Sequence, residues 1–364
     1  MLLIGAIGYC RWTGQIPRPL LNALIGRIRL PPKFQIGLYA THVPNARELT
    51  LGHGGIVFVG SRRAGKVYAL LPDARMSRAE KVITIARDLD VPTGVAFHDG
   101  ALYVAAVSRI LRYDNIEGRL NDPPAPVVVT SGLPSETEHG SRFIGFGPDG
   151  WLYVSVGVPC NVCEPKDSRY GTILRMQPDG TDMEVFARGI RNSVGFDWQP
   201  QTKELWFTDN GRDGMGDNIP PDELDHAPHA GMNFGFPYCH GTDVPDPVFG
   251  QKRGCSEFEP PAVDLPAHVA ALGMRFYTGG SFPKAFDNRV FIAEHGSWNR
   301  SVPTGDRISV IDAETGKYRP FAEGWQMGRF RWGRPVDVLV MPDGALLVSD
   351  DYAGAIYRIS YERK

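Results

Sequence analysis

The stretches Phe146-Gly-Pro-Asp-Gly-Trp-Leu-Tyr-Val-Ser155 and Val340-Met-Pro-Asp-Gly-Ala-Leu-Leu-Val-Ser349 are near copies of one another and decide the fold. Each places a Pro-Asp-Gly turn between two apolar runs, and a third strand-like segment follows after a loop, at 171–175 and 354–358. Because Asp and Gly tolerate the positive φ of a tight hairpin, this pattern predicts β-hairpins.

Weaker copies of the same pattern recur along the chain, at residues 51–60, 95–104, 194–198 and 288–293. Together the six copies predict an all-β, six-bladed β-propeller of four-stranded antiparallel blades over residues 30–364. The 42 Gly and 30 Pro of this 364-residue chain fit many short strands joined by tight turns. No stretch has helical periodicity over more than about two turns, and residues 22–29 are the best candidate for a helix. A long irregular insertion is expected at 213–266, between blades four and five.

Residues 1–29 are predicted to be a separate N-terminal segment. Its first nine residues are apolar but too short to cross a bilayer and lack a basic start, which indicates the remnant of a signal or an anchor ending near Cys10. No other segment reaches the length of an integral membrane span. The formal charge of −2, with Lys and Arg scattered singly, argues against a nucleic-acid partner and favours a small neutral substrate.

Four cysteines leave two interpretations open. Cys160 and Cys163 do not form a haem-attachment motif, because Glu164 stands where that motif has His. A zinc site with Cys239 and Cys255 is one alternative, although those two cysteines are sixteen positions apart. Structural disulfides, with Cys160–Cys163 and Cys239–Cys255 as one pairing, are favoured and predict a periplasmic or secreted protein.

Candidate chemical residues fall in loops at equivalent places in several blades. His139 and Arg142 precede blade three and combine a base for neutral pH with a permanent cation. Arg191 and Asn192 precede blade four and suit a planar ligand that carries carboxylates. Since loops of a propeller converge at its axis, these residues predict one shared cavity for an anion.

The loop after the second strand of blade four is rich in oxygen ligands. It reads Asp209-Asn-Gly-Arg-Asp-Gly-Met-Gly-Asp217, which suits Ca²⁺ without matching the twelve-residue helical calcium loop. His295 and Arg334 occupy corresponding loops of blades five and six. They extend the predicted cavity to five blades.

These motifs in this order resemble the soluble quinoprotein glucose and sorbosone dehydrogenases. The resemblance covers residues 30–361 and rests on loop motifs, of which Phe291-Ile-Ala-Glu-His-Gly-Ser-Trp-Asn-Arg300 and Cys160-Asn-Val-Cys163 point to the sorbosone dehydrogenase branch. The other motifs are His139-Gly-Ser-Arg142, Gly189-Ile-Arg-Asn192, Asp209-Asn-Gly-Arg212, Asn233-Phe-Gly-Phe-Pro237 and Gly333-Arg-Pro-Val-Asp337. The resemblance implies an oxidoreductase that uses pyrroloquinoline quinone (PQQ) and Ca²⁺ to oxidise an aldose, sorbosone-like or related sugar.

The resemblance also implies roles for individual residues. His139 would take the hydroxyl proton of the sugar while a hydride passes to the quinone, with Arg191 beside it as a second catalytic group. The backbone carbonyls of Gly211 and Arg212 would bind Ca²⁺, with Asp217 in support. The residues implied to contact PQQ are Arg142, Arg191, Asn192, Asn210, His295 and Arg334.

Three positions depart from the glucose-oxidising members of this family. Val158 stands where they have an acidic residue, His295 where they have a lysine, and Val336 where they have a second arginine. These departures argue against glucose as the substrate. With no haem motif in the chain, the electron acceptor is expected to be a separate cytochrome or membrane quinone.

Two other functions remain as alternatives. A metal-dependent sugar lactonase of the gluconolactonase type would need carboxylate and amide side chains converging on one ion, without paired arginines. A non-catalytic propeller binding module would point its loop His and Arg residues outward. The position of these side chains discriminates among the three functions.

Overall fold

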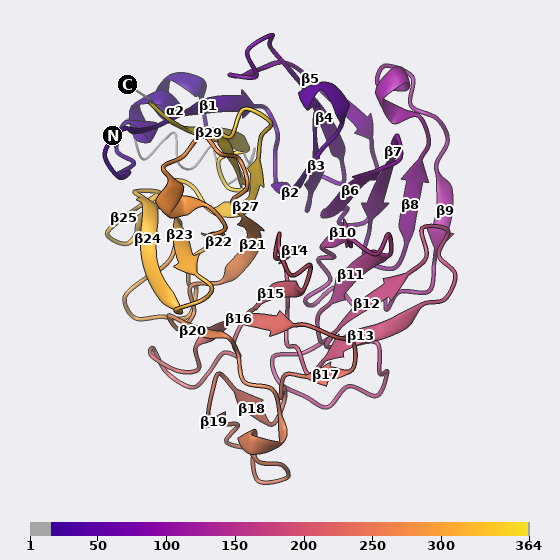
Figure 1. Cartoon of the computed structure of the whole chain (residues 1–364), viewed down its shortest axis with the longest axis vertical. Helices are drawn as coiled ribbons and strands as arrows, with labels where there is room; N and C mark the ends of the chain where they lie inside the picture. The colour runs from indigo at the N-terminus through magenta and orange to yellow at the C-terminus, as the bar shows by residue number, and fades with distance from the viewer. Residues whose placement is uncertain (1–15, 363–364) are drawn as a thin grey trace.

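The computed structural model describes residues 16–362, and over that range the chain is a six-bladed β-propeller (Figure 1). Blade one comprises β2 (Ala46–Leu51), β3 (Val57–Ser61), β4 (Val67–Pro72) and β5 (Ala79–Ala86), and blade two comprises β6 (Gly94–His98), β7 (Ala101–Ala105), β8 (Ile110–Tyr113) and β9 (Val127–Thr130). Blade three comprises β10 (Ile144–Phe146), β11 (Leu152–Val156), β12 (Thr172–Met176) and β13 (Glu184–Arg188), and blade four comprises β14 (Phe196–Trp198), β15 (Leu205–Asp209), β16 (Asp222–Ala227) and β20 (Val263–Leu265). Blade five comprises β21 (Ala271–Phe276), β22 (Val290–Glu294), β23 (Arg307–Asp312) and β24 (Lys317–Glu323). The predicted architecture is confirmed.

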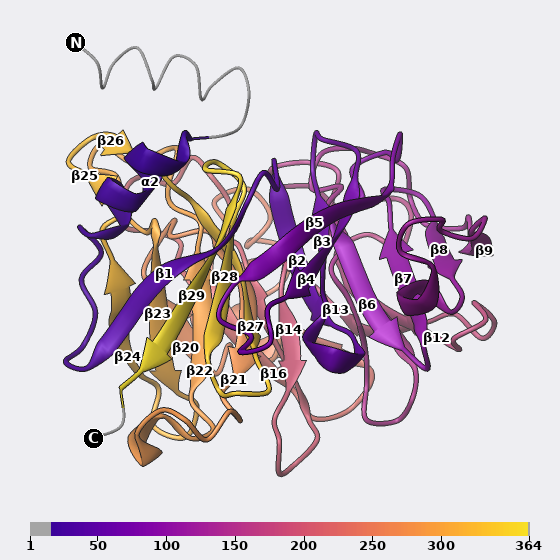
Figure 2. The same cartoon turned by 90° about the horizontal axis from the view of Figure 1, so that it is seen from above.

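The sixth blade joins the two ends of the propeller. It comprises β27 (Pro335–Val340), β28 (Leu346–Asp350), β29 (Ala355–Tyr361) and β1 (Phe34–Thr41), the first strand within the described residues. β1 pairs antiparallel with β29, from Phe34 opposite Tyr361 to Thr41 opposite Ala355 (Figure 2). This pairing closes the ring and satisfies an edge that an open sheet would leave exposed.

The Pro-Asp-Gly turns lie where the sequence predicts them. They connect β10 to β11 and β27 to β28, with Gly150 and Gly344 both at φ 80°. A Cβ at Gly344 would also lie 2.4 Å from the carbonyl oxygen of Gly279, so both conformation and space require glycine there.

The hydrophobic core lies between the faces of neighbouring blades. One cluster joins Tyr68 and Leu70 of blade one to Leu347 and Ile356 of blade six. Another joins Tyr103 of blade two to blade three. Successive strand residues point to opposite faces of a blade, and most blades pack against neighbours on both faces. The buried side chains fix the strand register and hold the loops that carry the site.

The helix lies earlier than predicted. α2 spans Arg18–Ile25 and buries Leu21 and Leu24 against blades five and six. It begins after Pro17, whose fixed φ favours a helix start. The predicted residues 26–29 lie beyond it, and residues 1–15, including Cys10 and the predicted signal remnant, lie outside the described residues.

The predicted insertion at 213–266 is wrong as a boundary between blades four and five. Two strands of blade four, β16 and β20, lie inside that range. β16 carries the buried carboxylates Asp222, Glu223 and Asp225, so its sequence shows no apolar alternation. The irregular part is the loop between β16 and β20, which holds β17 (Met232–Asn233), β18 (Cys239–His240) and β19 (Val244–Pro245).

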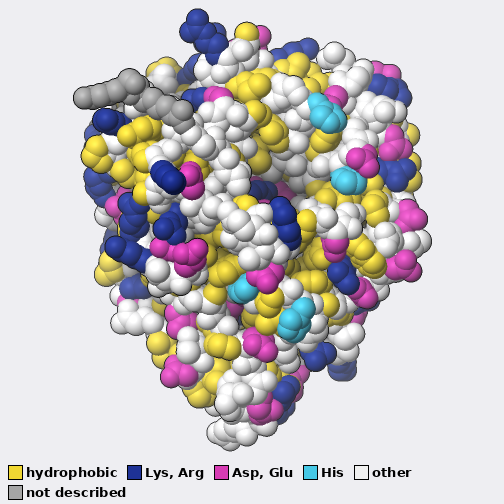
Figure 3. All heavy atoms as spheres, viewed as in Figure 1, with side chains coloured by type: hydrophobic (Ala, Val, Ile, Leu, Met, Phe, Trp, Pro, Cys, Tyr) yellow, Lys and Arg dark blue, Asp and Glu magenta, His cyan; other side chains and the backbone are white. Residues whose placement is uncertain are grey.

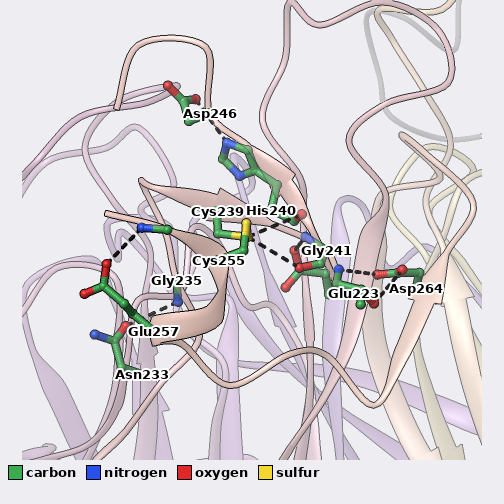
Figure 4. The surroundings of a disulfide bond; sticks show 12 residues. Glu223, Asn233, Gly235, Cys239, His240, Gly241, Asp246, Cys255, Glu257 and Asp264 are labelled. Carbon is green, nitrogen blue, oxygen red and sulfur yellow. Dashed lines mark hydrogen bonds and ion pairs between the residues drawn. A yellow bond between two sulfur atoms is a disulfide. The ribbon is translucent and has the colours of Figure 1, made fainter. Parts of the chain in front are cut away.

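Both predicted disulfides are present, Cys160–Cys163 and Cys239–Cys255. The zinc alternative is therefore wrong. Figure 4 shows the second disulfide within the insertion, beside the His240–Asp246 pair at 3.1 Å.

Within residues 16–362, no helix is both long and apolar enough to cross a bilayer. The remaining short strands are β25 (Gln326–Met327) and β26 (Phe330–Arg331), which pair with each other.

Candidate active site

Loops from five blades line a cavity of about 350 Å³. The face seen in Figure 3 is hollowed near the propeller axis, with basic and acidic side chains inside the hollow. Seven of the predicted site residues line the cavity: His139, Arg191, Asn192, Asn210, Gly211, His295 and Arg334. The predicted convergence on one axial cavity is confirmed.

Four arginines give the cavity its basic lining. Besides Arg191 and Arg334, it contains Arg47 from β2 and Arg62 from the loop after β3. Arg47 and Arg191 are each 5% exposed, and a guanidinium buried to that extent needs partners. Arg47 pairs with Asp351 at 3.0 Å, yet within residues 16–362 its Nε has no hydrogen-bond partner. The cavity therefore offers an unfilled donor and excess positive charge to an anionic ligand.

Sequence reasoning did not find Arg47 or Arg62. Both lie in blade one, where the sequence pattern indicates a hairpin but no site residue. The available signal was the charged pair Arg47-Glu48 within a strand, since charged residues at buried strand positions indicate a polar cavity or a pairing site.

His139 lies between β9 and β10 with φ at 47°, in the left-handed region that few residues other than glycine adopt. Its Nδ1 lies 2.8 Å from the carbonyl oxygen of Val158. A carbonyl only accepts, so Nδ1 carries the hydrogen, and the neutral ring keeps a lone pair on Nε2. Among residues 16–362 no side chain or backbone group hydrogen-bonds to that Nε2.

The surroundings of His139 keep its ring neutral. Burial, together with the nearby guanidinium of Arg191, lowers the pKa of His139 to about 4. Gly157 makes room for the ring's attachment, because a Cβ there would lie 2.6 Å from the Cβ of His139 and 2.8 Å from Oδ1 of Asn192. That Oδ1 of Asn192 is itself buried, and no group in the described part of the chain hydrogen-bonds to it. The site thus presents a neutral base and an unused acceptor.

His295 is held more tightly. Its Nε2 lies 2.9 Å from Asp351, and Arg334 donates to the carbonyl oxygens of His295 and Gly296 at 2.8 and 2.7 Å. Burial and the charge of Arg334 lower the pKa of His295 to about 3. Burial opposes ionisation of Asp351, but the hydrogen bond from His295 and the positive charge of Arg47 keep its pKa well below the usual range. His295 is thus neutral and Asp351 is a carboxylate bridging to Arg47.

Arg142 does not line the cavity. It is 1% exposed and donates to three carbonyl oxygens, those of Val107 (3.0 Å), Pro134 (2.9 Å) and His139 (3.1 Å). It therefore supports the loop that carries His139. Loop position alone could not reveal the direction of this side chain.

The predicted calcium loop is partly at the cavity. Gly211 lines it, whereas the side chain of Arg212 turns away to Asp246 at 2.5 Å. Asp217 lies outside the lining and hydrogen-bonds Ser301. Two acids line the cavity there, Asp213 from the loop itself and Asp222, whose carboxylate accepts from the Gly211 amide at 2.8 Å.

The binding of Ca²⁺ by the backbone carbonyls of Gly211 and Arg212 stays a prediction. Between residues 16 and 362, no three His, Cys, Asp or Glu side chains are grouped so as to hold a metal ion. Asp222 fixes the backbone of Gly211 from β16, so it orients the peptide in which the predicted ligands lie. The sequence does not indicate Asp222 as a site residue, because Asp222 begins β16, which lies within the predicted irregular insertion.

Residues 96–358 match the family model described as Glucose / Sorbosone dehydrogenase. The chain belongs to this family. It is an oxidoreductase of the sugar dehydrogenase class, as predicted; its assignment to the sorbosone branch stays a prediction.

The chain is also similar to individual relatives and to solved structures. An uncharacterized protein of Borreliella burgdorferi is 34% identical over 354 residues, covering 92% of this chain and 91% of its own. Aldose sugar dehydrogenase YliI of Escherichia coli is 25% identical over 250 residues, covering 63% of this chain and 61% of its own. The holo form of the pyranose dehydrogenase PQQ domain from Coprinopsis cinerea has a TM-score of 0.77 at 18% identity, over 92% of this chain and 97% of that one, which supports the fold.

Proposed function

We propose that this protein is a PQQ-dependent sugar dehydrogenase in which His139 is the general base and Ca²⁺ is the Lewis acid. The observation that carries the proposal is the neutral His139 ring, with Nε2 unengaged, in a cavity lined by four arginines. A base that must accept a proton at neutral pH has to be unprotonated and accessible, and His139 is both.

The donor set of the cavity fits a planar tricarboxylate such as PQQ. Arg47, Arg191 and Arg334 would hold its carboxylates, because guanidinium groups bind carboxylates through charge-assisted hydrogen bonds. The unpartnered Nε of Arg47 and Oδ1 of Asn192 would gain partners on binding. When bound, PQQ supplies an electron-accepting quinone carbonyl and Ca²⁺ polarises it.

Ca²⁺ would be held by the backbone carbonyls of Gly211 and Arg212, as predicted. The hydrogen bond from Gly211 to Asp222 fixes this turn from one side. The ion pair of Arg212 with Asp246 fixes it from the other. A rigid pair of carbonyls loses little freedom when it coordinates an ion, which favours binding.

The sugar would meet an aromatic surface at the mouth of the cavity. Trp298 lines the cavity and is 76% exposed, unusual for so large an apolar side chain. Such a ring packs against the apolar face of a sugar and leaves the hydroxyl groups free. The hydroxyl to be oxidised would then give its proton to Nε2 of His139.

The proposed substrate class is an aldose or a sorbosone-like sugar other than glucose. At the three departing positions, Val158 is fully buried and contributes only its carbonyl to His139, His295 is engaged with Asp351, and Val336 is buried. None of these side chains can replace the charged groups of the glucose-oxidising members. A separate cytochrome or membrane quinone would reoxidise the cofactor.

A periplasmic or secreted location is part of the proposal. Its support is the pair of disulfides, which persist in oxidising compartments.

The alternatives are less favoured by the cavity. Its four arginines suit a large anion rather than the carboxylate and amide cage that a metal-dependent lactonase needs. The inward convergence of His139, Arg191 and Arg334 disfavours a non-catalytic binding module.

The test is reconstitution of apoprotein made in a host without PQQ. PQQ with Ca²⁺ should allow a redox dye to be reduced by an aldose or by sorbosone, more slowly by glucose, and a chelator applied before reconstitution should prevent it. Dye reduction without PQQ, or none with any sugar in a panel of aldoses, sorbosone and polyols, contradicts the proposal. Hydrolysis of a sugar lactone by the same preparation would favour the lactonase.

A further inference from the structure

The disulfide Cys160–Cys163 closes a four-residue ring that places Asn161 against the cavity lining. Arg191 donates from Nε to the carbonyl oxygen of Asn161 at 2.8 Å and from Nη2 to its Oδ1 at 2.9 Å. The same Oδ1 accepts from the Asp213 amide at 2.9 Å, and Nδ2 donates to the Asp213 carbonyl at 3.1 Å. Asn161 thus joins the loop before blade four to the loop after β15.

The contacts of Asn161 determine where the Arg191 guanidinium lies. Two of its nitrogens bind Asn161, and Nη1 donates to the carbonyl oxygen of Asn210 at 3.1 Å. The carboxylate of Asp213 is more distant, at 3.5 Å. The partners within 3.1 Å are neutral, so they fix the direction of the guanidinium without supplying an opposite charge of their own.

The disulfide explains how a surface loop can hold this geometry. All four ring residues are only partly buried, so packing alone constrains them weakly. A covalent bridge removes conformations that the open loop would sample. The carbonyl, Oδ1 and Nδ2 of Asn161 are then presented together to Arg191 and Asp213.

We propose that Asn161, held in its disulfide ring, is a positioning residue that fixes the guanidinium of Arg191 for the anionic cofactor. This inference rests on the proposed function for the identity of the anion. It assigns the Cys160–Cys163 bridge a role at the site rather than in the general stability of the fold.

The first test replaces the side chain and follows two readouts that do not require turnover. Asn161→Ala removes three of the four hydrogen bonds and keeps the backbone carbonyl. Titration calorimetry with PQQ and Ca²⁺ should show that the dissociation constant of the variant is at least tenfold larger than that of wild type. In the apoprotein, NMR titration should show a raised pKa of His139, because a mobile Arg191 opposes protonation of that ring less.

The matched control is Asn121→Ala. Asn121 is exposed, lies in another blade and accepts only from Lys81 at 3.3 Å. It should leave both readouts at their wild-type values. A folded Asn161→Ala protein with the dissociation constant within twofold of wild type and the pKa of His139 unmoved overturns the proposal.

A second variant opens the ring without touching Asn161. Cys160→Ser/Cys163→Ser should change both readouts in the same direction by smaller amounts, and it decides the matter if Asn161→Ala fails to fold. A ring-opened protein that binds PQQ as tightly as wild type overturns the role of the bridge. If wild type itself does not bind PQQ, the proposed function fails, while the His139 titration still decides whether Asn161 positions Arg191.

Discussion

Two buried histidines in the same cavity differ in what holds them. His139 binds one backbone carbonyl and is partly exposed toward the cavity. His295 is 9% exposed, binds the carboxylate of Asp351 and has its own carbonyl held by Arg334. Burial lowers the pKa of both rings, so basicity does not distinguish them.

The two histidines differ in their exposure to the cavity and in whether their hydrogen-bond partner is neutral or charged. On the His295 side, Arg47, Asp351, His295 and Arg334 form one buried charged network, and any change there disturbs its neighbours. On the His139 side, a neutral ring is oriented by a neutral carbonyl, and its Nε2 has no hydrogen-bond partner among residues 16–362. The His295 side should therefore respond in stability and the His139 side in turnover.

The largest stability effect should come from Asp351→Asn. This change leaves Arg47 buried without its carboxylate partner, and breaking such a pair costs about 3 kcal/mol of unfolding free energy. Urea denaturation of the apoprotein measures it. The control Asp122→Asn, in an exposed pair with Arg119, should change stability by less than about 1 kcal/mol. Equal effects of the two changes would contradict a buried network.

A pH-dependent difference should follow from the lowered pKa of His139. The folded ring titrates at about 4 and an unfolded histidine at about 6.5, so the unfolded chain takes up the proton first as pH falls. Wild type should therefore lose stability relative to His139→Asn between about pH 6.5 and 4, by at most about 3 kcal/mol. Urea midpoints of both proteins at several pH values test this, and a pH-independent difference would show that the ring is not perturbed.

The smallest effect on turnover should come from His295→Gln. The Gln amide can still donate to Asp351, so the network keeps its hydrogen bond and loses only the ring. We expect kcat of the reconstituted enzyme to change less than about tenfold, or about 1.4 kcal/mol. A loss of a thousandfold would make His295 the base and reverse the comparison.

The sequence predicted the blades better than the walls of the cavity. Hairpin turns are local, so Asp149-Gly150 and Asp343-Gly344 located two blades without further information. β16 was not recognised, because Asp222 and its neighbours place carboxylates where strands are usually apolar. The direction of a loop side chain depends on tertiary packing, which is why Arg142 was assigned to the ligand although it binds carbonyls.

Long-range partners were also beyond the sequence. Arg47 and Asp351 are joined by the closure of blade six onto blade one, and no spacing in the chain indicates that contact. The sequence predicts Asp217 as the acid at the end of the acidic loop after β15, yet the acids at the cavity are Asp213 earlier in that loop and Asp222 from the next strand. Residue types predicted a cavity lined by arginine and histidine, and tertiary packing determines which of these residues line it.

The most direct test of the central claim compares wild type with His139→Asn in a single turnover. Asn tolerates the positive φ at this position and can donate to the carbonyl of Val158, but it has no basic nitrogen. Both proteins are loaded with PQQ and Ca²⁺, mixed anaerobically with an oxidisable aldose, and followed by the absorbance of the cofactor. His53→Asn, an exposed histidine, is the control. We expect the cofactor of His139→Asn to bind normally and to be reduced about 10² to 10⁴ times more slowly than in wild type. Reduction at the wild-type rate would contradict the role of His139.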